Sequence, residues 1–202
     1  MVQAVHMSRT THNTDLEDTA AGEGLAGVIV RPLDRHVDER GDLVELFRRS
    51  WDGVVDPVQW NLVRTKPGTL RGVHVHSRHS DYLIPAIGRF WLALKDIRPG
   101  SPTHGRVLEL DLHGDDACTV TIPPGVAHGF YFPDGGAFIY GVTDYWSLDD
   151  ELGCAWDDPG LGFCWPLTGP PVISERDRTA GSLDEMTRVW SEQVLASSPA
   201  AG

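Results

Sequence analysis

The sequence predicts an all-β sandwich or barrel, followed by a single short helix near the C-terminus. From Gly27 onward, short apolar or alternating runs follow one another, separated by glycine, proline and aspartate, and about ten such runs are typical of all-β domains. Helical periodicity is confined to residues 182–195. The chain has 202 residues, of which 41% are hydrophobic, so one domain can bury about 70% of its unfolded surface.

The segments are expected in a simple order along the chain. Residues 1–24 are rich in threonine, alanine, aspartate and glycine without periodicity, which predicts a disordered tail. Residues 25–181 form the predicted β domain. Its strands are expected at residues 28–30, 43–47, 58–63, 72–76, 82–87, 90–94, 106–112, 118–122, 130–132 and 137–143.

The last part of the chain differs in amino-acid composition from the predicted strands. Residues 149–171 are rich in aspartate, glycine and proline but also hold Trp156 and Trp165, so we expect an extended arm packed by aromatic side chains. Residues 182–202 are expected to form the helix and a short tail. Ser182 and Glu185 have the spacing of a capping box, which predicts where this helix begins.

Charge and cysteine content narrow the function classes. The net charge of −12 argues against nucleic-acid binding, which needs a basic surface. Lys66 and Lys95 are the only lysines, so arginine must bind any phosphate or carboxylate, and its planar fork suits both. No run reaches the ~18 apolar residues of a membrane span. Three cysteines cannot form a disulfide framework, so we expect a cytoplasmic protein.

The residues most suited to catalysis or metal binding are histidines at two places in the sequence. His74 and His76 project to the same face if their segment is a strand, because side chains alternate with a period of two. His79 and Asp81 follow within five residues, and His128 comes directly after a Pro-x-Gly turn. Such a set is expected to serve catalysis or metal binding rather than general packing.

The order of these residues resembles the two motifs of the cupin superfamily. The first motif, His-x-His-x4-Asp-x6-Gly, is matched by His74, His76, Asp81 and Gly88, and the second, Pro-x-Gly-x2-His, by residues 123–128. Cupins are double-stranded β-helices, or jelly rolls. The resemblance therefore implies a jelly roll with a short C-terminal helix, in agreement with the strand pattern.

From about Gly27 to Glu185 the chain is more closely similar to the dTDP-4-dehydrorhamnose 3,5-epimerase family. The matching stretches include Leu70-Arg71-Gly72-Val73-His74, Asp96-Ile97-Arg98, Ile122-Pro123-Pro124-Gly125-x-Ala127-His128-Gly129-Phe130, Phe138-x-Tyr140 and Ile173-Ser174-x-x-Asp177-Arg178. The resemblance implies an isomerase of deoxysugar or antibiotic biosynthesis. Its substrate would be a dTDP-4-keto-6-deoxyhexose, epimerised at C3, C5 or both.

The same resemblance implies roles for single residues. His74 would be the base, Asp177 would hold its tautomer and stabilise the imidazolium, and Tyr140 would be the acid on the opposite face. The resemblance further implies a homodimer without a cofactor, in which Arg40 and Glu45 act across the dimer interface. Substrate-binding roles would fall to Arg40, Glu45, Gln59, Asn61, Arg71, His128, Tyr145 and Arg176.

One departure from the family keeps a second hypothesis open. Asp81 stands where family members carry an active-site lysine. His74, His76, Asp81 and His128 then complete a set of three histidines and one carboxylate, which suits a divalent transition metal. The alternative is thus a metal-dependent oxygenase, isomerase or cyclase on the same scaffold. A third possibility is a metal-free member that binds or cyclises another small molecule.

Overall fold

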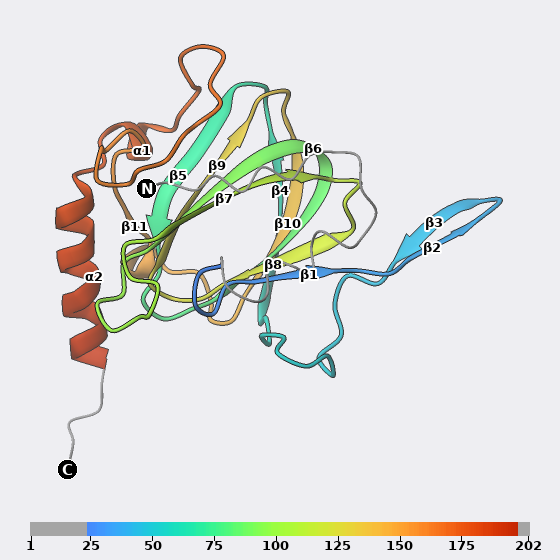
Figure 1. Cartoon of the computed structure of the whole chain (residues 1–202), viewed down its shortest axis with the longest axis horizontal. Helices are drawn as coiled ribbons and strands as arrows, with labels where there is room; N and C mark the ends of the chain where they lie inside the picture. The colour runs from blue at the N-terminus through green and yellow to red at the C-terminus, as the bar shows by residue number, and fades with distance from the viewer. Residues whose placement is uncertain (1–23, 198–202) are drawn as a thin grey trace.

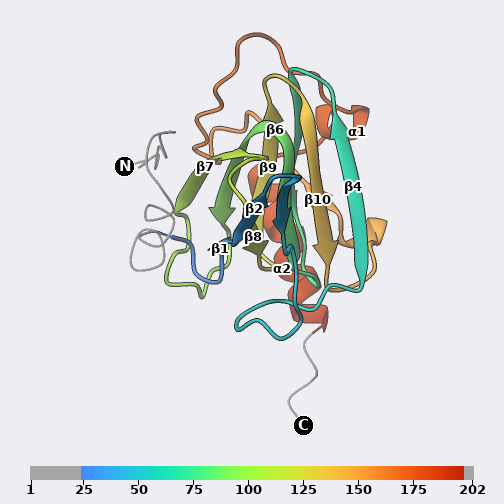
Figure 2. The ribbon, with the colours of Figure 1, turned by 90° about the vertical axis from the view of Figure 1, so that its right-hand side faces the viewer.

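A computed structural model describes residues 24–197 of the chain. The predicted disordered tail, 1–24, lies outside these residues except for its last position. Two β layers face each other, and a helix lies against one of them (Figures 1 and 2). The strands are β1 (Ile29–Pro32), β2 (Arg35–Asp38), β3 (Gly41–Val44), β4 (Gln59–Thr65), β5 (Thr69–Val75), β6 (Asp81–Asp96), β7 (Val107–His113), β8 (Cys118–Ile122), β9 (Val126–Phe132), β10 (Gly136–Val142) and β11 (Leu152–Gly153).

Strand β6 belongs to both layers because it is long enough to cross from one to the other. Its first half pairs with β8 and β10, and its second half pairs with β7 and β9. One layer therefore runs β1-β8-β6-β10-β4 and the other β7-β6-β9-β5-β11. All of these pairs are antiparallel, and the predicted jelly roll is confirmed.

Gly88 explains why two predicted strands, 82–87 and 90–94, form a single one. Its φ of +79° lies in the region that favours glycine, and a Cβ here would stand 2.6 Å from the carbonyl oxygen of Gly135. A glycine inside a strand commonly marks such a bend or a close backbone approach. The chain therefore turns at Gly88 without leaving the sheet.

The core between the layers is aromatic. Phe90, Phe130, Phe132 and Phe138 are all at least nine-tenths buried, with neighbouring ring centroids 5.0–6.2 Å apart. Stacked and edge-on ring pairs at such distances stabilise a core beyond the area they bury. Phe130 also lines a pocket of about 690 Å³, so this core supports the pocket directly.

Helix α2 (Leu183–Ser197) covers the outer face of β5 (Figure 1). Leu183, Met186 and Trp190 pack in one cluster with Val73 and Val75. The predicted start of the helix is confirmed, since the backbone N–H of Glu185 donates to Oγ of Ser182. The indole N–H of Trp190 donates to the carbonyl oxygen of His76 at 3.0 Å. The helix thereby fixes the residue that directly follows β5.

The sequence pattern missed several short elements. Strands β2 and β3 form a hairpin that projects from the body (Figure 1), where only residues 43–47 were expected to be extended. The arm at 149–171 contains β11, and the short helix α1 (Glu175–Arg178) follows the arm. No helix of the described chain is long and apolar enough to cross a membrane.

Candidate active site

A β-bulge in β5 turns two predicted site residues toward the same pocket. Arg71 lies opposite Phe130 of β9, but His74 lies opposite His128, so the register shifts by one residue between them. In an unbroken strand, positions 71 and 74 would face opposite sides. Because the bulge inserts one extra residue, both side chains line the pocket.

Gly72 is the residue that makes this bulge sterically allowed. Its φ is +110°, and a Cβ at this position would lie 2.9 Å from the Cα of Gly129 and from the carbonyl oxygen of His128. Only glycine fits between β5 and β9 there without moving backbone atoms. Gly72 therefore allows the bulge that turns both Arg71 and His74 toward the pocket.

The pocket has a volume of about 690 Å³ and opens between the two layers. Six predicted site residues line it: Arg71, His74, His128, Tyr140, Arg176 and Asp177. His76 and Asp81 of the alternative metal set line it as well. The structure therefore brings most of the predicted chemistry into one cavity. The lining also includes Arg64, Lys66, His79, Trp146, Glu151 and Ser174.

His74 and Asp177 form a close pair at the pocket wall. Nε2 of His74 lies 2.8 Å from Oδ1 of Asp177. Asp177 is held in place by Ser174, the N-cap of α1, whose Oγ accepts from its backbone N–H. Burial raises the pKa of Asp177, but the hydrogen bond and charge of His74 outweigh it and lower the pKa to about 2. The ionised carboxylate lies in position to stabilise a positive charge on the His74 ring.

Two neighbours complete the surroundings of the His74 ring. Arg176 Nη2 lies 2.6 Å from Nε2, and the guanidinium also pairs with Asp177 and Glu151 at 3.3–3.4 Å. Oε1 of Glu151 lies 3.4 Å from Nδ1 of His74. Nε2 thus lies between a carboxylate, which only accepts, and a guanidinium, which only donates, while Nδ1 faces Glu151. The sequence did not identify Glu151 as a site residue, because it is simply the last residue of the acidic run Asp149-Asp150-Glu151.

Tyr140 reaches the pocket from the opposite layer. It lies on β10, opposite Leu83 of β6 and Asn61 of β4. Burial, assisted by the carboxylates of Asp81 and Glu151, raises the pKa of the Tyr140 phenol. The phenol therefore stays protonated and has a proton to give. His74 and Tyr140 thus place an imidazole and a phenol on two strands of different layers.

Basic side chains line the pocket although the chain as a whole carries a negative net charge. Arg64, Lys66, Arg71 and Arg176 all line the cavity, and Nε of Arg71 donates to Oγ1 of Thr65. A local cluster of guanidinium groups attracts anions whatever the sign of the whole protein. The arrangement can bind a di-anionic group such as a diphosphate beside the His74–Asp177 pair.

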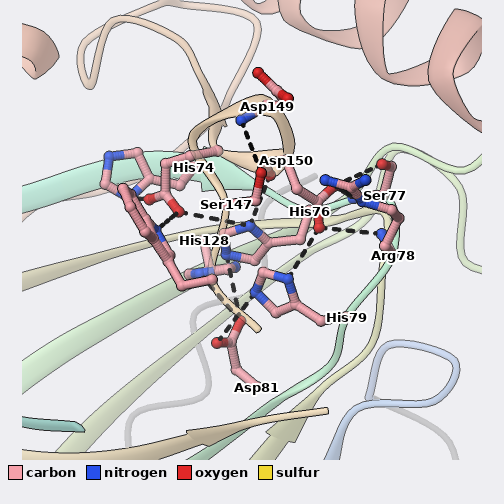
Figure 3. A network of polar contacts seen from close by, with 12 residues as sticks. His74, His76, Ser77, Arg78, His79, Asp81, His128, Ser147, Asp149 and Asp150 are labelled. Carbon is pink, nitrogen blue, oxygen red and sulfur yellow. Dashed lines mark hydrogen bonds and ion pairs between the residues drawn. The ribbon is translucent and has the colours of Figure 1, made fainter. Parts of the chain in front are cut away.

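Three further side chains converge in the buried wall of the same pocket (Figure 3). Nε2 of His76 and Nε2 of His128 lie 3.5 and 3.6 Å from Oδ2 of Asp81. Burial lowers the pKa of each histidine to about 4 and raises the pKa of Asp81. Donor atoms of these three residues lie within 4.8 Å of one another, and His74 is not part of the group.

The four-residue metal set expected from the sequence is therefore incorrect in one member. His74 is turned toward Asp177 and Glu151, at 2.8 and 3.4 Å, and its ring nitrogens do not belong to the group formed by His76, Asp81 and His128. A second group, His76, His79 and Asp150, also has ligand spacing. The carboxylate of Asp150, however, already accepts from Ser77, Arg78 and His79.

Five predicted substrate-binding residues lie outside the pocket lining. Arg40 pairs with Asp38, and Glu45 pairs with Arg48, on and next to the projecting hairpin. Their roles across a dimer interface stay predictions. Gln59 donates to Asn61 and accepts from the backbone N–H of Trp146. Tyr145 is 71% exposed. Trp146 lines the pocket instead, where its indole N–H donates to Glu151 at 2.8 Å.

Comparison with known proteins gives close relatives over most of the chain. Residues 23–185 match the family model described as dTDP-4-dehydrorhamnose 3,5-epimerase. The chain is 35% identical over 149 residues to the enzyme of that name from Pseudomonas aeruginosa, covering 70% of this chain and 82% of the relative. It is 33% identical over 170 residues to the Neisseria gonorrhoeae enzyme, covering 81% of this chain but only 51% of that relative. The chain thus spans about half the length of the gonococcal protein.

Solved structures of similar proteins carry bound nucleotide sugars. The dTDP-6-deoxy-D-glucose-3,5-epimerase RmlC of Legionella pneumophila, in complex with dTDP-4-keto-L-rhamnose, is 31% identical with a TM-score of 0.73. The match covers 78% of this chain and 88% of that one. ChmJ, a 3'-monoepimerase from Streptomyces bikiniensis in complex with dTDP-quinovose, is 26% identical with a TM-score of 0.75, covering 86% and 96%.

Proposed function

The chain belongs to the dTDP-4-dehydrorhamnose 3,5-epimerase family, and from this premise we propose that it is an isomerase of a dTDP-4-keto-6-deoxyhexose. The reaction inverts C3, C5 or both. The observation that carries this proposal is the His74–Asp177 pair at 2.8 Å, which faces the same cavity as Tyr140. Relatives of this chain include an epimerase acting at both positions and a 3'-monoepimerase by name, so the number of inverted centres is left to experiment.

The chemistry follows from the position of the ketone. Hydrogens at C3 and C5 flank the C4 carbonyl, so removal of either as a proton gives an enolate. His74 takes the proton, and the ionised Asp177 stabilises the resulting imidazolium. The protonated phenol of Tyr140 returns a proton from the opposite face, which inverts the carbon. Side chains alone move both protons in this route, so it calls for no cofactor.

The nucleotide end of the substrate is expected at the arginine cluster. Arg71 and Arg176, supported by Arg64 and Lys66, line the cavity next to the base. Guanidinium groups bind the paired oxygens of a phosphate through two parallel hydrogen bonds. Binding energy gathered at the diphosphate then holds the sugar ring in position for proton transfer.

The proposal also includes the oligomeric state of the protein and its cellular compartment. We expect a homodimer, because the projecting hairpin exposes two apolar side chains, Val37 at 73% and Leu43 at 60%, on strands that pair with no further strand of the described chain, and a second copy can cover such an edge. Size-exclusion chromatography with light scattering tests this expectation. Cys118, Cys154 and Cys164 are free thiols, which suits the reducing cytoplasm.

The decisive experiment is proton NMR of dTDP-4-keto-6-deoxyglucose with the enzyme in D₂O. We expect deuterium to enter C3, C5 or both, and His74→Asn to abolish the entry. Tyr140→Phe should keep exchange at the carbon but lose inversion. His104→Asn, at an exposed histidine, is the matched control and should behave like the wild type. Absence of exchange at both carbons with the wild-type protein would refute the proposed function.

A further inference from the structure

We propose that His76, Asp81 and His128 form a binding site for a divalent transition metal in the buried wall of the pocket, separate from the His74–Asp177 pair. The three residues come from the position directly after β5, the start of β6 and the strand β9, so two layers of the fold contribute ligands. All three are at least nine-tenths buried. The site does not depend on the proposed epimerase function.

The distances match those between ligands around one metal ion. Metal–nitrogen and metal–oxygen bonds of about 2.0–2.2 Å place neighbouring ligands of a tetrahedron about 3.3–3.6 Å apart. The two Nε2 atoms lie 3.5 and 3.6 Å from Oδ2 of Asp81. These distances are too long for good N–H···O hydrogen bonds. They are suitable for an ion held between the three atoms.

The tautomers of both histidines leave the correct nitrogen for a metal. Nδ1 of His76 lies 3.0 Å from the carbonyl oxygen of Asp150, and Nδ1 of His128 lies 3.1 Å from that of Val126. A carbonyl only accepts, so each Nδ1 carries the proton. Each Nε2 then presents a lone pair toward Asp81. Backbone carbonyls of this kind commonly orient metal-binding histidines.

The carboxylate between them lacks a proton donor. Oδ2 of Asp81 is buried and accepts no hydrogen bond, although buried polar atoms almost always have a partner. Two imidazole lone pairs and one carboxylate oxygen therefore meet without a hydrogen between them. A divalent cation satisfies all three at once, which is the simplest physical reason for this arrangement.

His79 supports the site without being a ligand. Its ring stacks on His76 with centroids 3.9 Å apart, and its Nδ1 lies 2.9 Å from Oδ2 of Asp150. That carboxylate is fully used by hydrogen bonds from residues 77–79. His79 and Asp150 thus hold the His76 ring in place, as seen in Figure 3.

Three protein ligands leave at least one coordination position open. Because the three residues line the cavity that also holds His74 and Tyr140, the open position faces the space where a small molecule would bind. A metal there would supply a Lewis acid for a carbonyl oxygen, while His74 stays free to act as a base. This catalytic role, unlike metal binding itself, rests on the proposed function.

The test is a Co²⁺ titration of the metal-stripped full-length protein, followed by its visible absorption. We expect about one Co²⁺ per chain, displaced by Zn²⁺. Asp81→Asn and His128→Gln should each weaken binding by more than the ~100-fold typical of losing a supporting hydrogen bond. His74→Asn and the exposed His104→Asn should bind as the wild type does. Thermal melts identify any variant that does not fold, and the second variant then decides.

Other outcomes overturn the proposal. If the wild type takes up no Co²⁺, or if Asp81→Asn and His128→Gln bind as tightly as the wild type, the site does not exist. If His74→Asn also loses the metal, the two sites are not separate. Deuterium exchange measured with and without metal tests the catalytic role. Bound metal without exchange removes the epimerase function but keeps the site, whereas exchange that is equal with and without metal removes only the catalytic role.

Discussion

Nε2 of His74 lies 2.8 Å from Oδ1 of Asp177, although 103 residues separate the two in sequence. Two elements that meet only in the folded chain create this pair. His74 comes from the bulged strand β5, and Asp177 from the short helix α1, where Ser174 caps the backbone. The pair therefore forms because the arm before α1 folds back and places this helix at the pocket.

The first prediction concerns the charge of Asp177. Asp177→Asn keeps the size of the side chain but removes the negative charge that stabilises protonated His74. We expect kcat for deuterium exchange to fall about 10²–10⁴-fold with little change in KM, since Asp177 does not bind the nucleotide. Ser174→Ala is the milder companion variant, because it removes only the N-cap. A fall in KM and kcat together in Asp177→Asn would contradict the assigned role.

The second prediction concerns Arg71 and the nucleotide. Arg71→Ala removes a cation from the pocket, and hydrogen bonds to charged groups contribute about 1.5–3 kcal/mol. Calorimetric titration with dTDP should show affinity weakened about 10–100-fold. Arg188→Ala is the matched control, because Arg188 forms an exposed pair with Glu192 on α2. Equal dTDP affinity in Arg71→Ala and the wild type would place the diphosphate elsewhere.

The sequence could predict most strands and the histidines of the pocket, but not the direction in which each of these side chains points. Alternation identified most strands, and the two motifs identified His74, His76 and His128. The bulge between Arg71 and His74 was not visible in the pattern, because one extra residue reverses the face of a strand without changing its composition. The bulge lets Arg71 and His74 line one pocket. The pattern also could not show that His74 pairs with Asp177 and stays outside the group of His76, Asp81 and His128.

Residues on irregular segments were harder to predict for a related reason. Glu151 and Trp146 lie where no periodicity constrains the chain, and their place in the pocket depends on how the arm folds back. Gln59 donates to Oδ1 of Asn61, and neither residue lines the cavity. The hairpin that carries Arg40 projects from the body, so a single chain cannot place this residue at the pocket.

The third prediction tests the bulge itself. Gly72→Ala puts a Cβ 2.9 Å from two backbone atoms at a φ of +110°, and strained backbone of this kind costs about 1–3 kcal/mol before any clash. We expect unfolding free energy to fall by at least about 2 kcal/mol and exchange activity to be lost. Gly100→Ala is the control, because no atom lies within 4 Å of its Cβ position. Similar stability of both variants would show that the bulge does not need glycine.

The fourth prediction separates function from stability at Asp81. Its Oδ2 is buried without a hydrogen-bond donor, so Asp81→Asn removes an unsatisfied charged group at little change in shape. We expect the metal-free variant to be more stable than the metal-free wild type, by about 1–2 kcal/mol in urea unfolding. With Co²⁺ present the order should reverse. A variant that is less stable than the wild type without metal would mean that Asp81 is paired in the protein alone.

The fifth prediction is a pH dependence that arises far from the pocket. Asp96 is fully buried and accepts hydrogen bonds from Arg98, Ser101 and Thr103 at 2.5–2.8 Å. Burial alone would raise the pKa of Asp96, but these bonds outweigh it and hold the pKa well below the usual value near 4. The unfolded chain therefore takes up the proton first. The resulting stabilisation is complete above about pH 5 and declines as pH falls through the ordinary aspartate pKa toward the lower folded value.

Asp96→Asn should remove this part of the acid dependence. It also leaves the half-buried Arg98 without its carboxylate, so we expect about 3 kcal/mol lower unfolding free energy at pH 7. The difference from the wild type should shrink as the pH falls from 5 toward 2, because the unfolded wild-type chain takes up a proton at position 96 that the folded chain does not. Asp38→Asn, which breaks an exposed pair with Arg40, is the control with a much smaller effect. A difference that is constant from pH 7 to pH 2 would show that packing, and not the charge of Asp96, stabilises this loop.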